Sequence, residues 1–494
     1  MKRAGIIILL LAIGAFLGAT GSITLQPGET EESINITWYS QANDGTPLVR
    51  IDGRTIEAEQ IPLLLPTKYI ANEYRDLTRV TNKATITGLL PDTTYTYRLS
   101  DDGERWSKAH SFRTPGEDGF VFAFIADAQQ SSFWKVIDDR GWNPRHPVPK
   151  HSWDRVAYVL ESTGATLLVS GGDQTDDYHW GRTGEYNHLF APDIMASIPF
   201  APSVGNHDRT YMFTNHFNLP NEQDVEPVYT TAHNFDYSNY VTKKKGDPGQ
   251  KYGVKAVDGV YDFIERRQAE TVGNYFYLYC NVLFVTLNNS GYPSSMEEGE
   301  AYIRNFRQTL QAAVERYSGE YDWLIVTYHK PTIAMGKHIA STDVEYFHKA
   351  GLEDLMDEFS VDFVLSGHNA LYSRSYVIKS GMITEDGSDS YTDPDGTIYI
   401  DGNCAADASY SEPFDLLKKD NEDYPLLADG SAGSKGYLSG TLPFGVQVWN
   451  QEYSPGYMLF RVDGRTISAE SYILEGDSRK PGSKLIDSFT VTKT

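Results

Sequence analysis

From residue 119 onward, short apolar runs alternate with segments of helical periodicity, and this alternation limits the possible folds more than any other feature of the chain. The apolar runs include GFVFAFIAD, ATLLVSGGD, YDWLIVTYHKP and VDFVLSGHN, and helical patterns such as YIRNFRQTLQAAVERY stand between them. Strands that alternate with helices predict an α/β layered core. Because each run is almost continuously apolar, we expect its strand to be covered on both faces.

The segments at both ends of the chain have the patterns of β-structure. Near the C-terminus, GTIYIDGN, YMLFRVDGRTISAESYIL and LIDSFTVTK predict a second sheet that closes the same domain. Residues 22–115 alternate apolar and polar residues in SINITWYS and TTYTYRLS, with Trp38 on an early strand, and predict a small two-sheet sandwich similar to a fibronectin type III domain. We therefore expect domains at 22–115 and 119–494. Residues 221–272 have weak periodicity and are expected to form a surface excursion.

The first 21 residues have the pattern of a secretory signal peptide. Lys2 and Arg3 precede the apolar run AGIIILLLAIGAFLGA, and small residues follow it, so we expect cleavage near Gly21. An uncleaved anchor is the alternative, although the run is short for a membrane span. We expect the mature chain to be secreted, periplasmic or held in the cell envelope, without a membrane span.

Charge and cysteine content exclude several classes of partner and scaffold. The formal net charge is −24, and the only basic cluster comprises Lys243, Lys244 and Lys245. This balance argues against a nucleic acid or an anionic membrane as a partner. Cys280 and Cys404 are the only cysteines, so no disulfide framework is expected, and both are predicted to be buried and inert.

Polar residues follow five of the predicted strands, each time where the strand ends. The set comprises Asp127, Gln129, Asp173, Asp176, Asn206, His207, Asp208, His329 and His368. Ligands of α/β sheets bind beyond the carboxyl ends of strands, so these side chains can converge in one crevice. Each alone is weak evidence, because single histidines and Asp-Gly pairs are common in solvated turns. Oxygen and imidazole ligands without thiolate suit Mn, Fe or Zn better than Mg.

The order of these motifs resembles that of the calcineurin-like metallophosphoesterases, and most of all that of secreted bacterial relatives of purple acid phosphatases. The motifs are Asp127-x-Gln129, Gly172-Asp173-x-x-Asp176, Gly205-Asn206-His207-Asp208, His329 and Gly367-His368. The resemblance covers nearly the whole mature chain, including the N-terminal sandwich. It implies a four-layer α/β/β/α sandwich behind the small all-β domain. It also implies a metal-dependent hydrolase of small-molecule phosphate esters, and leaves open which ester and which oligomeric state.

The resemblance assigns most of the polar residues to two metal pockets. Asp173 would bridge two metal ions, divalent or of mixed valence, with Fe, Mn and Zn as the candidates. The first pocket would contain Asp127 and Gln129, and Gln129 stands where many relatives have a histidine. The second pocket would be completed by three side chains from later strand ends: Asn206, His329 and His368.

The resemblance also implies an acid and a substrate contact. His207 would not bind metal; it would protonate the leaving oxygen, and the Asp176 carboxylate would orient its ring. His338 stands where such enzymes often contact the substrate phosphate. A solvated loop histidine is the equally weighted alternative for His338.

The chain departs from the family pattern at two positions. Ala370 stands where a histidine would complete the pocket of Asp127, so we expect weaker metal binding there, with Asn369 and Asp176 as nearby candidates for compensation. Asp176 also replaces the tyrosine of the purple enzymes, so an iron site would lack the tyrosinate colour. Three interpretations follow: a working phosphoesterase with an altered first pocket, a non-catalytic relative with a binding or structural role, and a carbohydrate-binding or surface module.

Overall fold

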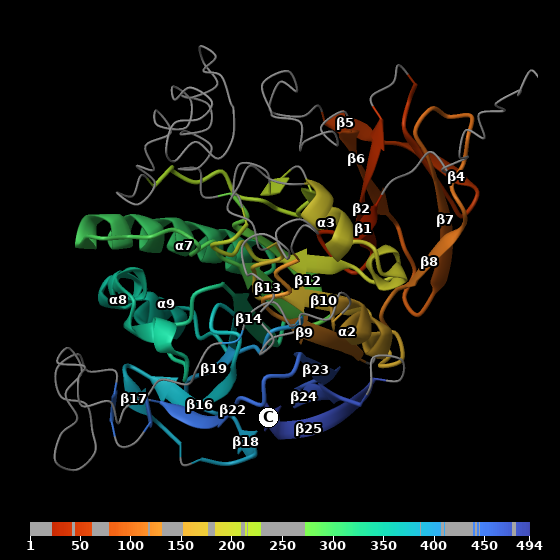
Figure 1. Cartoon of the computed structure of the whole chain (residues 1–494). Helices are drawn as coiled ribbons and strands as arrows, with labels where there is room; N and C mark the ends of the chain where they lie inside the picture. Colours follow the sequence, from red (N-terminus) through yellow and green to blue (C-terminus); the bar gives the residue numbers. More distant parts are fainter. Residues whose placement is uncertain are drawn as a thin grey trace, which may run out of the picture.

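The computed structural model describes residues 22–41, 45–61, 79–116, 119–130, 152–175, 183–208, 213–214, 216–228, 272–385, 387–406, 410, 438–439, 442–443, 445–476 and 481–494. The predicted signal peptide, Asp176 and most of the segment 221–272 lie outside these residues. Figure 1 shows a small β-sandwich, in red and orange, beside a larger domain that contains the other strands and all the labelled helices.

Two antiparallel sheets form the N-terminal sandwich. One has the order β1–β2–β6–β5: β1 (Ile23–Pro27), β2 (Ser33–Gln41), β6 (Arg79–Thr87) and β5 (Glu59–Ile61). The other has the order β4–β3–β7–β8: β4 (Arg54–Glu57), β3 (Leu48–Ile51), β7 (Thr94–Ser100) and β8 (His110–Arg113). Alternate residues of β7 are buried, as its sequence pattern predicts. Trp38 lies in the core between the sheets, and its indole NH donates to Asp101, 2.9 Å away.

The larger domain contains two sheets of mixed strand direction. The seven-stranded sheet comprises β11 (Phe200–Pro202), β10 (Leu167–Ser170), β9 (Phe120–Ile125), β23 (Gly456–Asp463), β24 (Thr466–Glu475), β25 (Gly482–Thr492) and β18 (Ser390–Thr392). The eight-stranded sheet comprises β12 (Tyr275–Tyr279), β13 (Val282–Thr286), β14 (Trp323–Thr327), β15 (Phe363–Ser366), β19 (Thr397–Asp401), β16 (Tyr372–Lys379), β17 (Met382–Ile383) and β22 (Val446–Asn450). A separate short pair is formed by β20 (Leu438–Ser439) and β21 (Leu442–Pro443).

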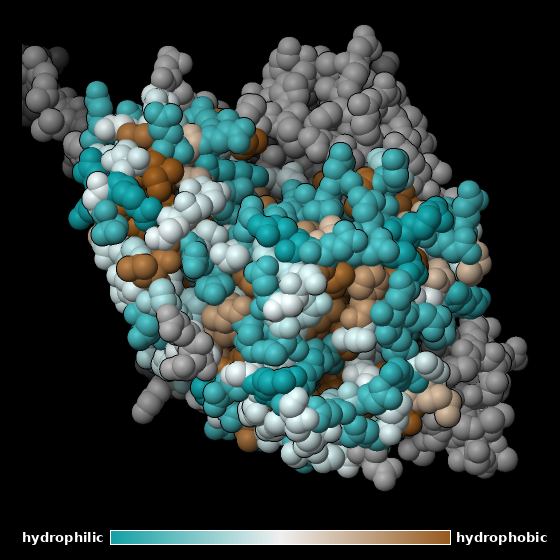
Figure 2. Space-filling view, turned by 180° about the vertical axis from the view of Figure 1, so that it is seen from behind, coloured by the Kyte–Doolittle hydropathy of each residue, from teal (hydrophilic) through white to brown (hydrophobic). Residues whose placement is uncertain are grey.

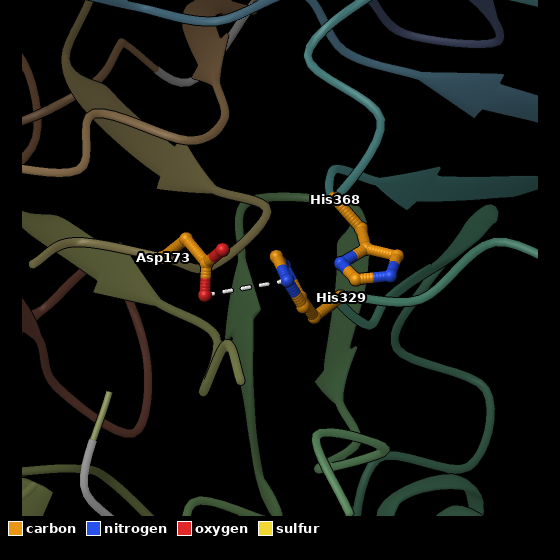
Figure 3. A group of neighbouring side chains, drawn as sticks. All are labelled: Asp173, His329 and His368. Atoms are coloured by element: carbon orange, nitrogen blue, oxygen red, sulfur yellow. Dashed lines mark ion pairs between the residues drawn. The ribbon is translucent and has the colours of Figure 1, made fainter. Parts of the chain in front are cut away.

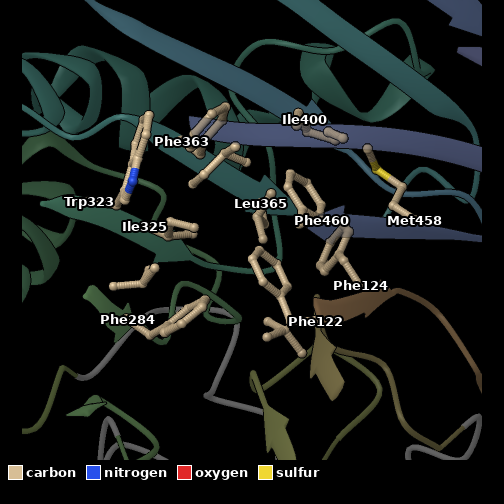
Figure 4. Packing of buried hydrophobic residues seen from close by; sticks show 14 of the residues in the cluster. Phe122, Phe124, Phe284, Trp323, Ile325, Phe363, Leu365, Ile400, Met458 and Phe460 are labelled. Atoms are coloured by element: carbon tan, nitrogen blue, oxygen red, sulfur yellow. The ribbon is translucent and has the colours of Figure 1, made fainter. Parts of the chain in front are cut away.

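The two sheets pack face to face through a core rich in aromatic side chains. Phe122 and Phe460 stack with ring centroids 4.5 Å apart, and Phe122 meets Phe284 of the other sheet edge-on at 5.3 Å. Figure 4 shows this interdigitation, with Trp323 and Phe363 in the same layer. Full burial of one such side chain stabilises the fold by about 1.5–3 kcal/mol. The C-terminal strands therefore close the domain as a second layer, as the sequence predicts.

Helices cover the outer faces of both sheets. On the seven-stranded sheet, the helical elements are α2 (Ser152–Leu160), α3 (Thr183–Leu189) and the 3₁₀ helix η3 (Asp193–Ala196). On the eight-stranded sheet they are α7 (Met296–Arg316), α8 (Thr342–Lys349) and α9 (Leu352–Glu358), with the 3₁₀ helix η5 (Lys337–Ala340) preceding α8. The layers are α/β/β/α, and this confirms the predicted fold class.

Helix α7 illustrates how the sequence pattern produces this packing. Its buried residues include Tyr302, Phe306 and Leu310, which recur every four positions and form one apolar stripe. Ser295 caps the helix by accepting a hydrogen bond from the backbone NH of Glu298.

None of the described helices is long and apolar enough to cross a membrane. The face in Figure 2 is mostly hydrophilic, with a smaller apolar area near the centre of the view.

Parallel strands bring distant parts of the sequence to the same end of each sheet. In the first sheet, β9, β10 and β11 run parallel, and in the second, β13, β14, β15 and β19 do so. The carboxyl ends of neighbouring parallel strands lie at one edge, so the polar residues that follow them become neighbours.

Candidate metal centre

Three side chains from three strand ends converge in the described part of the chain. Asp173 follows β10, His329 follows β14 and His368 follows β15, and each offers one ligand atom within 4.8 Å of the others. Figure 3 shows the carboxylate of Asp173 facing the ring of His329, with His368 on the other side of that ring. The oxygen Oδ1 of Asp173 lies 3.3 Å from Nε2 of His329. Carboxylate and imidazole groups at this spacing can hold one metal ion.

Asn206 joins this group from the end of β11. Its side-chain oxygen lies 2.9 Å from Nε2 of His329, the same nitrogen that faces Asp173. The opposite nitrogen, Nδ1, lies 2.8 Å from the carbonyl oxygen of Gly171, which orients the ring. The structure thus brings together all four residues predicted for the second pocket, although their role as ligands stays a prediction.

Asp127 and Gln129 also lie beside Asp173, because their backbone NH groups donate to the carbonyl oxygens of Gly172 and Asp173. Asp127 is buried after β9, and its two carboxylate oxygens accept the backbone NH of His368 at 3.0 and 2.9 Å. The amide nitrogen of Gln129 donates to Oδ2 of Asp173 at 3.2 Å. Both residues predicted for the first pocket therefore lie beside the predicted bridging carboxylate.

The backbone at this site is held in conformations that most residues avoid. Asp127, Asp173 and His368 have positive φ values of 48°, 52° and 74°, in the left-handed region. A Cβ atom on Gly205 would lie 2.1 Å from the Asp173 carboxylate, so only glycine allows this approach. Such strain persists where the surrounding structure enforces it, and it is common at functional sites.

Burial and mutual interaction set the charges of the site. Burial raises the pKa of Asp127 to about 8, so its ionisation is costly unless a cation lies beside it. Burial also opposes the ionisation of Asp173 and His329, but each stabilises the charge of the other: the pKa of Asp173 is lowered, and that of His329 is raised to about 9. Burial, together with the nearby His329, lowers the pKa of His368 well below its ordinary value, which favours the neutral, metal-binding imidazole.

The donor set fits a metal ion by an independent criterion. The side-chain oxygen Oε1 of Gln129 is buried and has no hydrogen-bond partner among the residues that the structure describes. Buried acceptors are almost always satisfied, so an unpaired one beside two carboxylates calls for an explanation. A cation between Gln129, Asp127 and Asp173 would both satisfy this oxygen and favour the ionised carboxylates.

Ala370, which stands where the resemblance implies a histidine, offers no side-chain donor to the site. Ala370 is 2% exposed, and its carbonyl oxygen accepts a hydrogen bond from Gln451 at 3.1 Å. The neighbouring Asn369 is fully buried, but its amide is engaged elsewhere: it donates to Asp401 at 2.8 Å and accepts the backbone NH of His338 at 3.2 Å. Asn369 is thus committed away from the pocket, and Asp176 lies outside the described residues.

His207 and His338 lie at the rim of the site. Nε2 of His207 is 3.9 Å from Oδ2 of Asp173, and the side chain is 20% exposed, which is suitable for contact with a substrate. The ring of His338 lies 4.5 Å from that of His368, centroid to centroid, and burial, aided by Lys337, lowers the pKa of His338 to about 4. These distances do not test the predicted roles of His207 as acid and His338 as phosphate contact. Both residues lie next to predicted metal ligands.

Asp208 organises the site in a way that its sequence position does not reveal. Its carboxylate accepts backbone NH groups from Gly205 at 2.9 Å, from Gln174 at 3.1 Å and from Thr175 at 3.2 Å. It thereby ties the loop after β10 to the loop after β11. In the sequence, Asp208 follows a strand without a predicted role; its place three residues after Gly205 is the one local signal of a loop-capping carboxylate.

Comparisons with known proteins identify the family of the chain. The protein-family model for calcineurin-like phosphoesterases matches residues 120–372. The family model for the N-terminal domain of purple acid phosphatases matches residues 21–114. An uncharacterized protein of Mycobacterium tuberculosis is 22% identical over 379 residues, which are 74% of this chain and 64% of that protein. Human acid phosphatase type 7 is 22% identical over 342 residues, which are 68% of this chain and 67% of that protein.

The chain thus spans 64% of the length of the mycobacterial relative, slightly less than two thirds. A solved structure, the purple acid phosphatase PPD1 from yellow lupin seeds, matches with a TM-score of 0.60 at 16% identity and covers 96% of this chain and 75% of that one. At this identity the match shows a shared fold. The phosphoesterase match covers just over half of the chain and includes all the polar strand-end residues from Asp127 to His368, so the chain belongs to the calcineurin-like phosphoesterase family.

Proposed function

We propose that this protein is a metal-dependent phosphoesterase that hydrolyses small-molecule phosphate esters. The observation that carries the proposal is the convergence of Asp173, His329 and His368, with Asn206, at the ends of strands from both sheets. Membership of the calcineurin-like phosphoesterase family and the similarity to human acid phosphatase type 7 support it. We propose Mn, Fe or Zn as the metals, because the donors are oxygen and imidazole.

The residues of the site have distinct tasks in this proposal. Bound cations would polarise the phosphoryl oxygens and activate water for in-line attack. Asp173 would contribute to both pockets, and Asn206, His329 and His368 would complete the second one. His207 would donate a proton to the leaving oxygen as general acid, and Asp176 would orient its ring. His338 would contact the phosphate from the rim beside His368.

The pocket of Asp127 is the weaker one in this proposal. It has Asp127, Asp173 and the amide oxygen of Gln129, whereas Ala370 offers no side-chain donor and Asn369 is engaged with Asp401. Loss of an imidazole ligand lowers affinity without removing the remaining oxygen donors. Activity should accordingly depend on added metal.

A non-catalytic role is the second candidate. The lack of a side-chain donor at Ala370 in the first pocket favours it. If Asp127, Asp173 and Gln129 do not hold a metal, the fold would serve binding or structure only. Metal content measured on the purified protein separates the two candidates. Hydrolysis of a panel of phosphate monoesters, diesters, nucleotides and sugar phosphates, after reconstitution with Mn, Fe, Zn or Mg, then tests the activity. Absence of bound metal and of turnover under all four conditions would defeat the proposal.

Replacing Ala370 with histidine is expected to raise the affinity of the first pocket and to lower the metal concentration that gives half-maximal turnover. Histidine tolerates the left-handed φ of 48° at this position better than most residues do, and His368 already has φ of 74°. Titration with Mn²⁺, read by calorimetry and by turnover, measures both effects.

The matched control is Ala370→Leu, which adds bulk without a donor. It should not increase affinity. Two firmly bound metal ions in the wild type, with no gain in Ala370→His, would show that another residue completes the first pocket.

Export is part of the proposal, and it rests on the sequence pattern of the first 21 residues alone. N-terminal sequencing of the protein recovered from the envelope or the medium tests it. A chain that begins near residue 22 is the expected result, and a cell-retained chain with an intact N-terminus would contradict it.

A further inference from the structure

Partly buried polar contacts join the N-terminal sandwich to the larger domain. The amine of Lys83, on β6, donates to the backbone carbonyl oxygens of Thr214 and, at 2.6 Å, of Phe217. The side chain of Asn35, on β2, donates to the carbonyl oxygen of Asn218 at 2.8 Å. These contacts hold residues 216–218 against one sheet of the sandwich. Buried polar groups are costly to expose when their partners are lost, so the contacts specify one relative position.

A line of side chains runs from this interface toward the candidate metal centre. The hydroxyl of Tyr39, on β2, forms a hydrogen bond with Nδ1 of His216, and both residues are buried. The His216 ring stacks on Tyr186, with centroids 3.6 Å apart and planes at 19°. The hydroxyl of Tyr186 donates to Oδ1 of Asp208 at 3.3 Å. Figure 1 shows α3, which carries Tyr186, beside β1 and β2 of the sandwich.

Asp208 is the point at which this line reaches the site. Its carboxylate accepts hydrogen bonds from both loops that carry predicted site residues, one with Asp173 and the other with Asn206 and His207. The backbone NH of His207 in turn donates to Oδ1 of Asp173 at 2.8 Å. A shift of Asp208 would therefore move the bridging carboxylate and the acid relative to each other.

The Tyr39 hydroxyl is the hydrogen-bond partner of the His216 ring within the described part of the chain. There, Nδ1 of His216 is paired with this hydroxyl, whereas the buried Nε2 has no partner. Burial lowers the pKa of His216 to about 3, so the ring is neutral at ordinary pH and acts by its shape and hydrogen bonding. Removing the hydroxyl would leave both nitrogens of the imidazole without a partner from the described residues, a state that buried rings avoid by moving.

We propose that the N-terminal β-sandwich is a positioning element of the metal centre, in which Tyr39, through His216 and Tyr186, fixes Asp208 and the loops that carry Asp173 and His207. This inference deepens the proposed function and rests on it for the catalytic consequence. Tyr39 is a positioning residue, because three side chains separate it from the reacting groups. The role assigned here to the sandwich differs from that of a separate binding module, which would need no contact with the site.

The test is the variant Tyr39→Phe in the full chain. It removes the hydroxyl but keeps the ring, which packs against Phe190 and His216. We expect the affinity for Mn²⁺ to fall about 10-fold, at the lower end of the range for lost outer-shell partners. The visible spectrum of the Co²⁺-loaded protein should change, and kcat should fall more than KM rises. Tyr186→Phe, which keeps the stacking and loses only the hydroxyl to Asp208, should give the same pattern.

The matched control is Tyr97→Phe. The hydroxyl of Tyr97 donates to the carbonyl oxygen of Ala196 at 2.7 Å, so it also links the sandwich to the larger domain but does not lead to Asp208. We expect this variant to lose thermal stability and to keep the Mn²⁺ affinity and the Co²⁺ spectrum of the wild type.

Two results would overturn the inference: unchanged metal affinity and spectrum in both Tyr39→Phe and Tyr186→Phe, or an equal loss in Tyr97→Phe. The first would show that the line of side chains does not reach the site, and the second that any weakening of the interface has the same effect. A wild type that binds Mn²⁺ but hydrolyses no ester would defeat the proposed function instead. The metal affinities and spectra of the variants would still decide the inference.

Discussion

Replacing His329 with alanine is expected to remove the more firmly bound metal ion and all phosphoesterase activity. The imidazole is fully buried and lies 3.3 Å from Asp173 and 2.9 Å from the side-chain oxygen of Asn206. It therefore stands between two other predicted ligands, and its loss opens the centre of the pocket. Losing an outer-shell partner typically costs about 10–100-fold in metal affinity, and a lost ligand should cost more. Metal per chain after dialysis, measured by mass spectrometry, gives the direct readout.

Two further variants separate metal loss from misfolding. Asn206→Ala changes a partly exposed residue at the same pocket, so it should lower metal content with little effect on the fold. His348→Ala makes the same substitution on α8, where the histidine pairs with Glu353 at 2.9 Å, and it should change neither metal content nor turnover. Full metal content in both His329→Ala and Asn206→Ala would show that the ligands lie elsewhere.

The fold was predictable from the sequence because its strongest signals are local. Continuous apolar runs such as YDWLIVTY became strands buried on both faces, and the stripe of Tyr302, Phe306 and Leu310 placed α7 on the outer side of the second sheet. The site was predictable for a related reason. Parallel strands carry their carboxyl ends to one edge, so polar residues that follow separate strands had to meet.

The contacts that tune the site were not predictable, because each depends on pairing between distant segments. Asn369 lies beside Ala370 in the sequence and was a candidate to compensate for it, yet its amide donates to Asp401, on another strand. The link between Tyr39 and His216 joins residues that are 177 positions apart. Neither the hydrophobic periodicity nor a motif in either segment indicates such a contact. The sequence thus indicates which residues reach the site, and the tertiary pairing decides which of their atoms remain available to it.

The variant His207→Ala is expected to keep near-normal metal binding and to lose turnover by about 10²–10⁴-fold on esters with poor leaving groups, the range for a lost general acid. Its ring lies 3.9 Å from Asp173 and is partly exposed, so it can reach a bound ester. Its backbone NH, which donates to Asp173, survives the substitution, and this is why the metal site should persist. Metal content and kcat on an alkyl phosphate give the two readouts.

A comparison of esters with good and poor leaving groups separates acid catalysis by His207 from its other contributions to turnover. An activated aryl ester departs without protonation, so His207→Ala should lose much less activity on it than on an alkyl phosphate. His338→Ala is the matched control: a residue that contacts only the phosphate should weaken both esters to the same extent and should act mainly on KM. An equal loss on both esters in His207→Ala would mean that His207 also binds the phosphate or supports a ligand. The proton would then have to come from another group beside Asp173, and the assignment of the acid would fall even if the metal centre stood.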